Sequence, residues 1–222
     1  MAKFYQVGGC VRDKLLGKQS KDIDFSVEAE SYEAMCIAVV GRGCEIKVEH
    51  PEHLTIRAIH PELGGVDFVL CRKDGVYTDG RRPDSVEMGT LADDLARRDF
   101  TVNALAEAED GSIVDLFDGQ KDLAALKLRC VGQTHKRMTE DALRMLRALR
   151  FSITKGFTLD AELESFMLWP ENVELLRKIS VERIRDEMLK CFEFDTLETL
   201  RRLDYFWRLR EEIFSRNLKL VP

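Results

Sequence analysis

Gly8-Gly9-Cys10-Val11-Arg12-Asp13 and, after a short gap, Lys21-Asp22-Ile23-Asp24-Phe25 are the stretches that decide the fold of this chain. The first follows an apolar run, Phe4–Val7, and precedes a helical pattern. This order predicts a strand, a glycine turn and a helix, which together present backbone N–H groups to an anion. Arg12 would add guanidinium donors for the same anion. Taken alone, the glycine pair is explained equally well by a simple turn.

The second stretch alternates apolar and acidic residues with a period of two, which is typical of a strand. Asp22 and Asp24 then leave the same face about 6–7 Å apart. Two carboxylates placed in this way can share Mg²⁺ ions, which in two-metal phosphoryl transfer activate the attacking hydroxyl and neutralise the leaving pyrophosphate. A solvated acidic strand is the alternative for an isolated pair, but a glycine turn accompanies this one.

Val66–Leu70 is an apolar run interrupted by one acid, Asp67. A lone carboxylate in such a run is costly if it is buried without a partner. We predict that Asp67 lies beside Asp22 and Asp24, where it would accept the proton of an incoming hydroxyl or complete a metal shell. An acid on an edge strand is the alternative.

Composition limits the class of protein. With 222 residues, 45% hydrophobic and 33% charged, the chain has room for one large or two small domains. It shows no apolar stretch near ~20 residues and no apolar N-terminal segment, so we expect a cytoplasmic protein. Six scattered cysteines without a C-x-x-C pair indicate buried thiols rather than disulfides or zinc ligands. The net charge of −6 argues against bulk nucleic-acid binding.

The pattern changes near residue 132. We predict an α/β head over residues 1–131, with a small mixed sheet and flanking helices, and an all-α segment over residues 132–222. Strands are expected at Phe4–Val7, Ile23–Val27, Cys44–Val48, Leu54–Ile59 and Val66–Cys71, and helices at Val11–Leu16 and Tyr32–Val40. The helices expected later are Glu140–Phe151, Leu159–Leu168, Val173–Ile179, Val181–Phe194 and Thr196–Ile213.

Two polar pairs stand at helix-like spacing. Asp99 and Asn103 are four residues apart, so both can face one ligand. Asp141 and Arg144 are three residues apart, where an acid and a guanidinium can present fixed hydrogen-bond partners to a base edge. For the second pair, an Asp–Arg ion pair on a charged outer face is the alternative.

Five blocks together resemble the class II tRNA nucleotidyltransferase (CCA-adding enzyme) and bacterial poly(A) polymerase family, whose members add CCA or A to RNA 3′ ends. The resemblance implies a nucleotidyltransferase head, then a helical neck and a shortened body, because family members continue beyond the position of Pro222 into body and tail domains. The blocks are Gly8–Gly17 with the Asp22/Asp24 pair, Arg97–Ala104, Asp115–Leu123, Glu140–Phe151 and Ile179–Ile184.

The resemblance also implies residue roles. Asp22 and Asp24 would bind Mg²⁺, and the polar loop Arg72–Pro83 would be the mobile element linked to the switch from C to A addition. The nucleotide would be held by Gly8, Gly9, Arg12 and Arg98 at the triphosphate, Asp99 and Asn103 near the ribose, Asp141 and Arg144 at the base, and Arg147 and Arg150 at phosphate or base.

The last expected helix mixes arginines with aromatic residues. We predict that its arginines contact phosphates of the tRNA acceptor stem. The alternative is that Leu203, Phe206 and Trp207 are ordinary core. The arginines concerned are Arg201, Arg202, Arg208 and Arg210.

The function implied by the resemblance is Mg²⁺-dependent, template-independent transfer of CMP and AMP from CTP and ATP to the 3′ end of tRNA. An A-only or poly(A) polymerase is the alternative within the same chemistry. A catalytically silent nucleotide- or tRNA-binding module is the alternative from another class. The oligomeric state stays open, with a dimer as one way to replace the missing tail.

Overall fold

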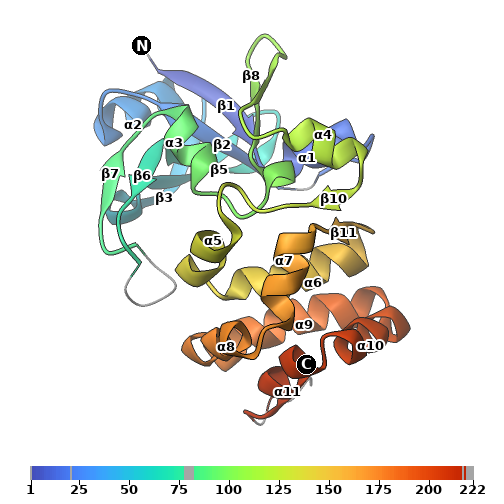
Figure 1. Cartoon of the computed structure of the whole chain (residues 1–222). Helices are drawn as coiled ribbons and strands as arrows, with labels where there is room; N and C mark the ends of the chain where they lie inside the picture. The colour runs from blue at the N-terminus through green and yellow to red at the C-terminus, as the bar shows by residue number, and fades with distance from the viewer. Residues whose placement is uncertain (1, 21, 78–82, 217, 219–222) are drawn as a thin grey trace. The chain divides into compact units, whose positions relative to one another are not determined.

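The computed structural model describes residues 2–20, 22–77, 83–216 and 218, so residues 78–82 of the predicted mobile loop lie outside the described residues. The described chain forms two compact units (Figure 1). The first, here called the head, contains the residues up to Val76 together with 83–121, and the second contains Tyr77 and the residues from Asp122 onward. The boundary at residue 131 and the functional roles of the two parts stay predictions.

The head is built on a seven-stranded sheet with the order β3-β4-β5-β2-β1-β8-β9. Strands β2 and β5 pair in parallel and all other neighbours pair antiparallel, which confirms the predicted mixed sheet. The elements are β1 (Lys3–Val7), α1 (Gly9–Leu15), β2 (Ile23–Glu28), α2 (Tyr32–Gly41), β3 (Glu45–His50), the 3₁₀ turn η1 (Pro51–His53), β4 (Thr55–His60), β5 (Gly64–Leu70), β6 (Arg72–Asp74), β7 (Val86–Met88), α3 (Leu91–Ala96), the 3₁₀ turn η2 (Thr101–Asn103), β8 (Leu105–Ala108) and β9 (Ile113–Asp115), with α4 (Gly119–Ala124) at the end of the head.

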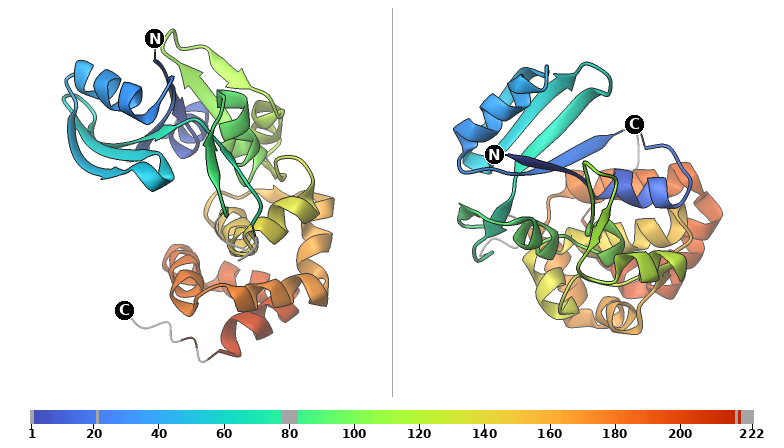
Figure 2. Two further views of the ribbon diagram at one scale, coloured as in Figure 1. Left: turned by 90° about the vertical axis from the view of Figure 1, so that its left-hand side faces the viewer. Right: turned by 90° about the horizontal axis from the view of Figure 1, so that it is seen from above.

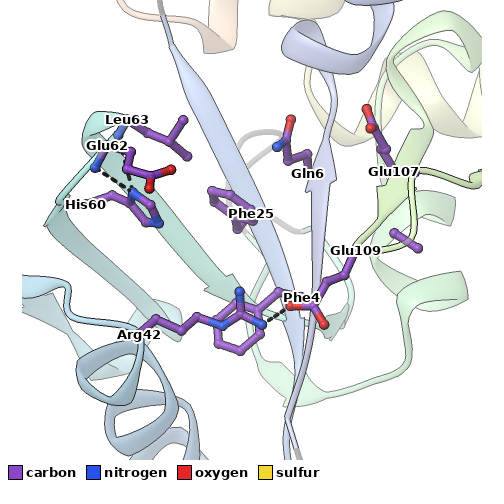
Figure 3. A pocket seen from close by; sticks show the side chains of 11 residues that line it. Phe4, Gln6, Phe25, Arg42, His60, Glu62, Leu63, Glu107 and Glu109 are labelled. Atoms are coloured by element: carbon purple, nitrogen blue, oxygen red, sulfur yellow. Dashed lines mark hydrogen bonds and ion pairs between the residues drawn. The ribbon is translucent and has the colours of Figure 1, made fainter.

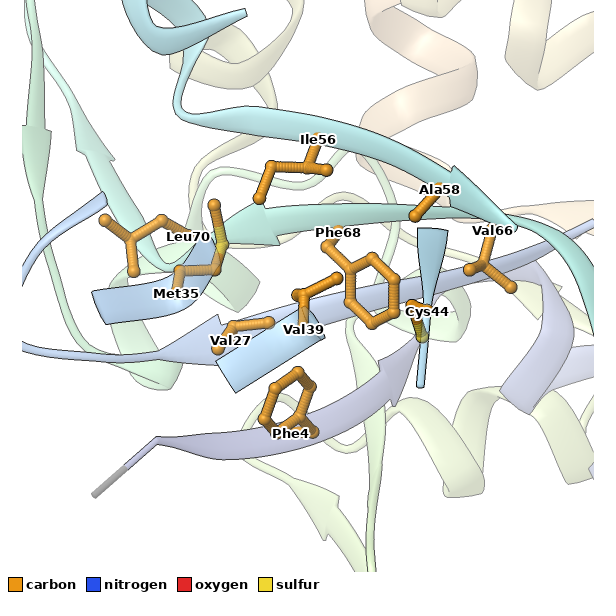
Figure 4. Close-up of a cluster of buried hydrophobic side chains, with 10 residues drawn as sticks. All are labelled: Phe4, Val27, Met35, Val39, Cys44, Ile56, Ala58, Val66, Phe68 and Leu70. Atoms are coloured by element: carbon orange, nitrogen blue, oxygen red, sulfur yellow. The ribbon is translucent and has the colours of Figure 1, made fainter. Parts of the chain in front are cut away.

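Alternation along the strands gives the sheet one apolar face, which α2 covers (Figure 2). Ser31 caps the N-terminus of helix α2, and its hydroxyl accepts the Ala34 N–H at 3.1 Å. Phe68 lies at the centre of the cluster in Figure 4, 5.9 Å edge-on to Phe4 and stacked 5.1 Å from Phe25. The opposite face of β2, which carries Asp24 and Ser26, is therefore free for polar chemistry.

The second unit is mainly helical, as predicted. Its elements are β10 (Lys127–Leu128), α5 (Thr134–Glu140), α6 (Leu143–Thr154), β11 (Thr158–Leu159), α7 (Ala161–Leu168), α8 (Pro170–Val173), the 3₁₀ turn η3 (Glu174–Lys178), α9 (Val181–Phe194), α10 (Thr196–Tyr205) and α11 (Trp207–Phe214). Strands β10 and β11 pair in parallel, a short pairing that the sequence pattern did not predict.

Two expected helices are each divided. The helix expected at Glu140–Phe151 is interrupted at Asp141, whose backbone is extended and whose carboxylate accepts the Leu143 N–H at 3.0 Å. The helix expected at Thr196–Ile213 is interrupted at Phe206, which is buried with φ −95° and ψ 54°. In both places a local cap or tertiary burial overrides a helical pattern that continues through the sequence.

Two predictions from composition can be compared with the fold. All six cysteines lie within the described residues as thiols outside disulfides, and five of them are buried, which agrees with the predicted thiols. Among the helices of the described ranges, none combines the length and apolar character needed to cross a bilayer.

Helices α6 and α9 are joined by a buried ion pair. Glu187 is 5% exposed and accepts the Arg150 Nε–H at 2.6 Å. Lys190 Nζ lies 3.3 Å from the other carboxylate oxygen. Burial disfavours the charged carboxylate, but the Arg150 guanidinium outweighs it and holds the pKa of Glu187 below its ordinary value.

Glu187→Gln is expected to destabilise the protein at pH 7 by about 2–3 kcal/mol, because it leaves the Arg150 charge without its counter-ion. A lowered carboxylate pKa stabilises the fold above the unfolded value, near 4.3, and this contribution is lost as pH falls through the lower folded pKa. Urea unfolding of both proteins between pH 7 and acid measures the difference. A gap that does not narrow in acid would contradict this account.

Candidate active site

The strand register brings the first sequence motif beside the second. Asp24 on β2 is the partner of Val7 on β1, and Gly8 follows Val7 directly. On its other side Asp24 is the partner of Asp67 on β5. Cross-strand partners point to the same face of a sheet. The glycine turn and the predicted third acid therefore flank Asp24 from opposite sides.

Acidic residues line a cavity of about 340 Å³ at this end of the sheet, with Asp22, Asp24 and Asp67 in its wall. Reduced hydration, followed by repulsion from Asp67, raises the pKa of Asp24. Arg57 lies in the same wall, with its Nε 3.4 Å from Asp67 Oδ1. A bound cation would reduce the repulsion between carboxylates held this close together.

The acids suit a hard divalent metal, because they offer only oxygen ligands and repel one another. Within the described part of the chain, three or more metal-binding side chains do not converge as a closed site. Asp22 and Asp24 would therefore supply part of a coordination shell. Mg²⁺ commonly completes its shell with water and substrate phosphates.

Arg98 lies against the glycine turn. Gly8 has φ 78°, and a Cβ atom added there would lie 2.7 Å from the Arg98 Nη1. The Arg98 charge also lowers the pKa of Asp24, although reduced hydration and Asp67 outweigh it. Its buried Nε has no hydrogen-bond partner among the described residues, so the guanidinium keeps a donor for an anion.

Gly8→Ala is expected to weaken nucleotide binding, because the added methyl group displaces Arg98 and because alanine is strained at positive φ by about 1–2 kcal/mol. Gly17→Ala is the matched control, since Gly17 also has positive φ, at 68°, and nothing lies within 4 Å of its added Cβ. Thermal unfolding and the KM for CTP distinguish the two effects. Equal KM values for both variants would contradict the Arg98 contact.

Arg98 is held by a buried acid that the sequence analysis did not identify. Asp94 on α3 is fully buried and accepts hydrogen bonds from Ser26 at 2.7 Å and from Arg98 at 3.1 Å. Arg97 binds the other Asp94 oxygen at 2.6 Å. The spacing of Asp94, Arg97 and Arg98 at i, i+3 and i+4 is the signal that could have indicated this cluster.

The predicted ribose pair is brought together, but not by a helix. Asn103 lies in η2, and its side-chain amide donates to Asp99 Oδ1 at 3.0 Å. The Asn103 side-chain oxygen accepts from Arg12 Nη1 at 2.6 Å. Arg12 is 5% exposed and also binds Asp13 at 2.9 Å. These contacts brace the first turn of α1, and the predicted phosphate contact of Arg12 stays a prediction.

In the second unit, the predicted base-reading residues are held by other charges. Asp141 Oδ2 accepts from Arg183 at 3.0 Å. Arg144 Nη1 binds Glu140 at 2.9 Å and the Arg137 carbonyl oxygen at 2.6 Å. Glu140 and Arg183, which the sequence analysis did not assign, therefore fix the orientation of both side chains.

The remaining predicted arginines have partners within their own unit. The Arg147 guanidinium lies 5.5 Å from the Phe151 ring centre. Arg150 binds Glu187, as described above, and Arg208 lies 4.3 Å over the Trp207 ring. Glu198 pairs with both Arg201 and Arg202, and Arg210 pairs with Asp204.

The core alternative for the last helices is correct for two of its three residues. Leu203 and Phe206 are buried, whereas Trp207 is 44% exposed. The acceptor-stem contact itself stays a prediction.

Two family matches cover most of the chain. The family described as "Poly A polymerase head domain" matches residues 4–129. The family described as "Probable RNA and SrmB- binding site of polymerase A" matches residues 156–206.

Curated relatives that match the chain are CCA-adding enzymes. A CCA-adding enzyme of Levilactobacillus brevis is 43% identical over 187 residues, covering 84% of this chain and 45% of the relative. One from Oceanobacillus iheyensis is 44% identical over 195 residues, covering 85% of this chain and 46% of the relative. The chain thus spans about half the length of the curated relatives it matches.

Solved structures agree with this result. The CCA-adding enzyme of Bacillus stearothermophilus in complex with CTP is 34% identical with a TM-score of 0.78, covering 91% of this chain and 47% of that one. The Thermotoga maritima CCA-adding enzyme complexed with tRNA_CCA is 28% identical with a TM-score of 0.77, covering 97% and 49%. The chain therefore belongs to the poly(A) polymerase head-domain family, which confirms the predicted resemblance to class II tRNA nucleotidyltransferases and bacterial poly(A) polymerases.

Proposed function

We propose that this chain transfers CMP and AMP from CTP and ATP to the 3′ end of tRNA, as a CCA-adding nucleotidyltransferase. The observation that carries the proposal is the register that places Asp24 between Asp67 and the Gly8 turn. Acids for a metal, a glycine turn and an arginine with a spare donor are the parts that a triphosphate requires. The relatives that match most of the chain are named CCA-adding enzymes.

In this proposal Asp22 and Asp24 hold Mg²⁺, which when bound neutralises the triphosphate and polarises the attacking hydroxyl. Asp67 is the candidate acceptor for the proton of that hydroxyl, because it points to the same face as Asp24. Arg98 and the backbone of Gly8 and Gly9 orient the phosphates.

The other predicted site residues are proposed to contact the sugar and the base of the nucleotide. Asp99 and Asn103 are proposed to lie near the ribose. Asp141 and Arg144 are proposed to read the base of CTP or ATP, since both are already oriented by neighbouring charges. A pre-oriented donor and acceptor discriminate between bases better than free side chains do.

An extension assay tests the proposal. A tRNA lacking its terminal CCA is incubated with Mg²⁺ and each nucleoside triphosphate alone, then with CTP and ATP together. We expect CTP alone to add cytidines, and ATP to be added only after them. Addition of ATP alone in long tails would identify an A-only polymerase instead.

The same assay addresses the silent binding module. If the chain binds CTP and tRNA but incorporates neither CMP nor AMP at any Mg²⁺ concentration, the transferase proposal is wrong. Asp141→Ala provides a second test of the transferase proposal. This variant should discriminate less well between CTP and UTP, while the Asp22 and Asp24 site remains intact.

A further inference from the structure

A second cavity, of about 380 Å³, opens on the other face of the head sheet (Figure 3). Phe25 lines it, and Phe25 points away from the face that carries Asp24 because side chains alternate along β2. The volume lies within the range of small-molecule sites. We call it the Phe25 cavity, and its polar and aromatic lining includes Phe4, Gln6, Phe25, Glu62, Glu107 and Glu109.

One row of side chains crosses the floor of the Phe25 cavity. Gln6 on β1 is the partner of Phe25 on one side and of Glu107 on the other. Phe25 is supported from β5 by Phe68, whose ring stacks on it at 5.1 Å. An aromatic ring, an amide and a carboxylate therefore lie side by side on adjacent strands.

Glu107 is a largely buried acid in the wall of this cavity. Its side chain is only 10% exposed, and Oε1 lies 2.5 Å from Lys14 Nζ. Its buried Oε2 has no hydrogen-bond partner among the described residues. A buried carboxylate oxygen without a donor is costly, so this position favours a ligand that carries N–H groups.

The cavity wall already contains one cation bound in the same chemical setting. The Arg42 guanidinium lies 3.7 Å over the Phe4 ring and pairs with Glu109. Phe25 with Glu107 repeats this combination of an aromatic ring and a carboxylate. Glu62 lies across Figure 3 from Glu107 and adds a second carboxylate. Among the described residues, Glu62 takes part in no ion pair.

We propose that the Phe25 cavity binds a small alkyl diamine. One ammonium group would donate to Glu107 Oε2, the methylene chain would lie across Phe25, and the second ammonium would face Glu62. Burial of the methylene chain against the Phe25 ring adds to the two charge interactions. The proposal is independent of the transferase function, because the cavity and the acidic site use opposite faces of the sheet.

Calorimetric titration of the whole chain with 1,4-diaminobutane tests the proposal, with butylamine and 1,4-butanediol as comparisons. We expect the diamine to bind more tightly than the monoamine, and the diol not to bind. Glu107→Gln should weaken diamine binding by about tenfold or more. Glu87→Gln removes the same charge from an exposed position on β7 and should leave binding unchanged.

Gln6→Lys provides a second variant that does not remove a carboxylate. Its ammonium would lie between Phe25 and Glu107 and would compete with the diamine, so binding should be lost while the thermal midpoint is kept. Gln120→Lys, at an exposed position on α4, adds the same charge elsewhere and should bind normally.

The ammonium could also come from a lysine side chain of a peptide. A lysine-containing tripeptide is therefore titrated in parallel, and tighter binding of the diamine supports a small-molecule site. Tighter binding of the tripeptide, no diamine binding, or equal binding by the wild type, Glu107→Gln and Gln6→Lys would each overturn the proposal.

Discussion

Replacing Asp22 and Asp24 together by alanine is expected to reduce nucleotide incorporation by at least about a thousandfold, while the fold remains intact. The two carboxylates are the proposed Mg²⁺ ligands. Neither lies in the apolar core, and Asp24 is repelled by Asp67. Their removal should therefore leave the metal-free thermal midpoint unchanged or raise it slightly, as is common for residues kept for function.

Three measurements check this expectation. Primer extension on a tRNA lacking CCA gives the rate, thermal unfolding gives the stability, and addition of Mg²⁺ should raise the wild-type midpoint but not that of the double variant. Glu87→Ala, at an exposed acid on β7, is the control and should behave like the wild type in all three. Retained incorporation by the double variant would remove these acids from the metal site.

The parts of the site that the sequence predicted depend on local patterns. Period-two alternation places Asp24 on a strand, and the glycine pair after an apolar run predicts the turn. Asp67 could be found because a single acid interrupts an apolar strand. In each case the signal lies within a few residues, and the strand pairing needed only to bring the three segments together.

The parts that the sequence did not predict depend on contacts between distant residues. Ser26 and Asp94 are 68 positions apart, and only the packing of α3 on β2 joins them. The helix break at Asp141 depends on a side-chain cap that competes with a continuous helical pattern. In the sequence alone, nothing distinguishes Glu187 from an exposed acid. Only the packing of α9 on α6 places it beside Arg150.

Replacing Asp94 by alanine is expected to cost about 3 kcal/mol of unfolding free energy and to weaken nucleotide binding. Removing one member of a buried ion pair leaves the other charge uncompensated. We expect a loss at the lower end of the range that is usual for a broken buried ion pair. The reason is that the Arg97 and Arg98 side chains are 22% and 20% exposed and can recover some hydration. Urea unfolding at pH 7 measures the loss.

The pH dependence follows from the same contacts. Burial disfavours the charged form of Asp94, but Arg97 and Arg98 outweigh it, so its pKa lies below the ordinary aspartate value. Its contribution is present above the unfolded pKa, near 3.9, and is lost as pH falls through the lower folded pKa. The stability gap between wild type and Asp94→Ala should therefore narrow only in strong acid.

Asp94→Asn separates the positioning effect from the stability effect. Asparagine keeps the size of the side chain and a partner for Ser26, but it loses the charge that holds Arg98 beside the Gly8 turn. We expect the KM for CTP to rise about tenfold with a smaller change in kcat, because Arg98 is proposed to bind the triphosphate in the ground state. Ser26→Ala removes the hydroxyl that donates to Asp94 and accepts from Arg98, but it keeps the Asp94 charge and should have a weaker effect. An unchanged KM in Asp94→Asn would show that Arg98 is held in place without this carboxylate.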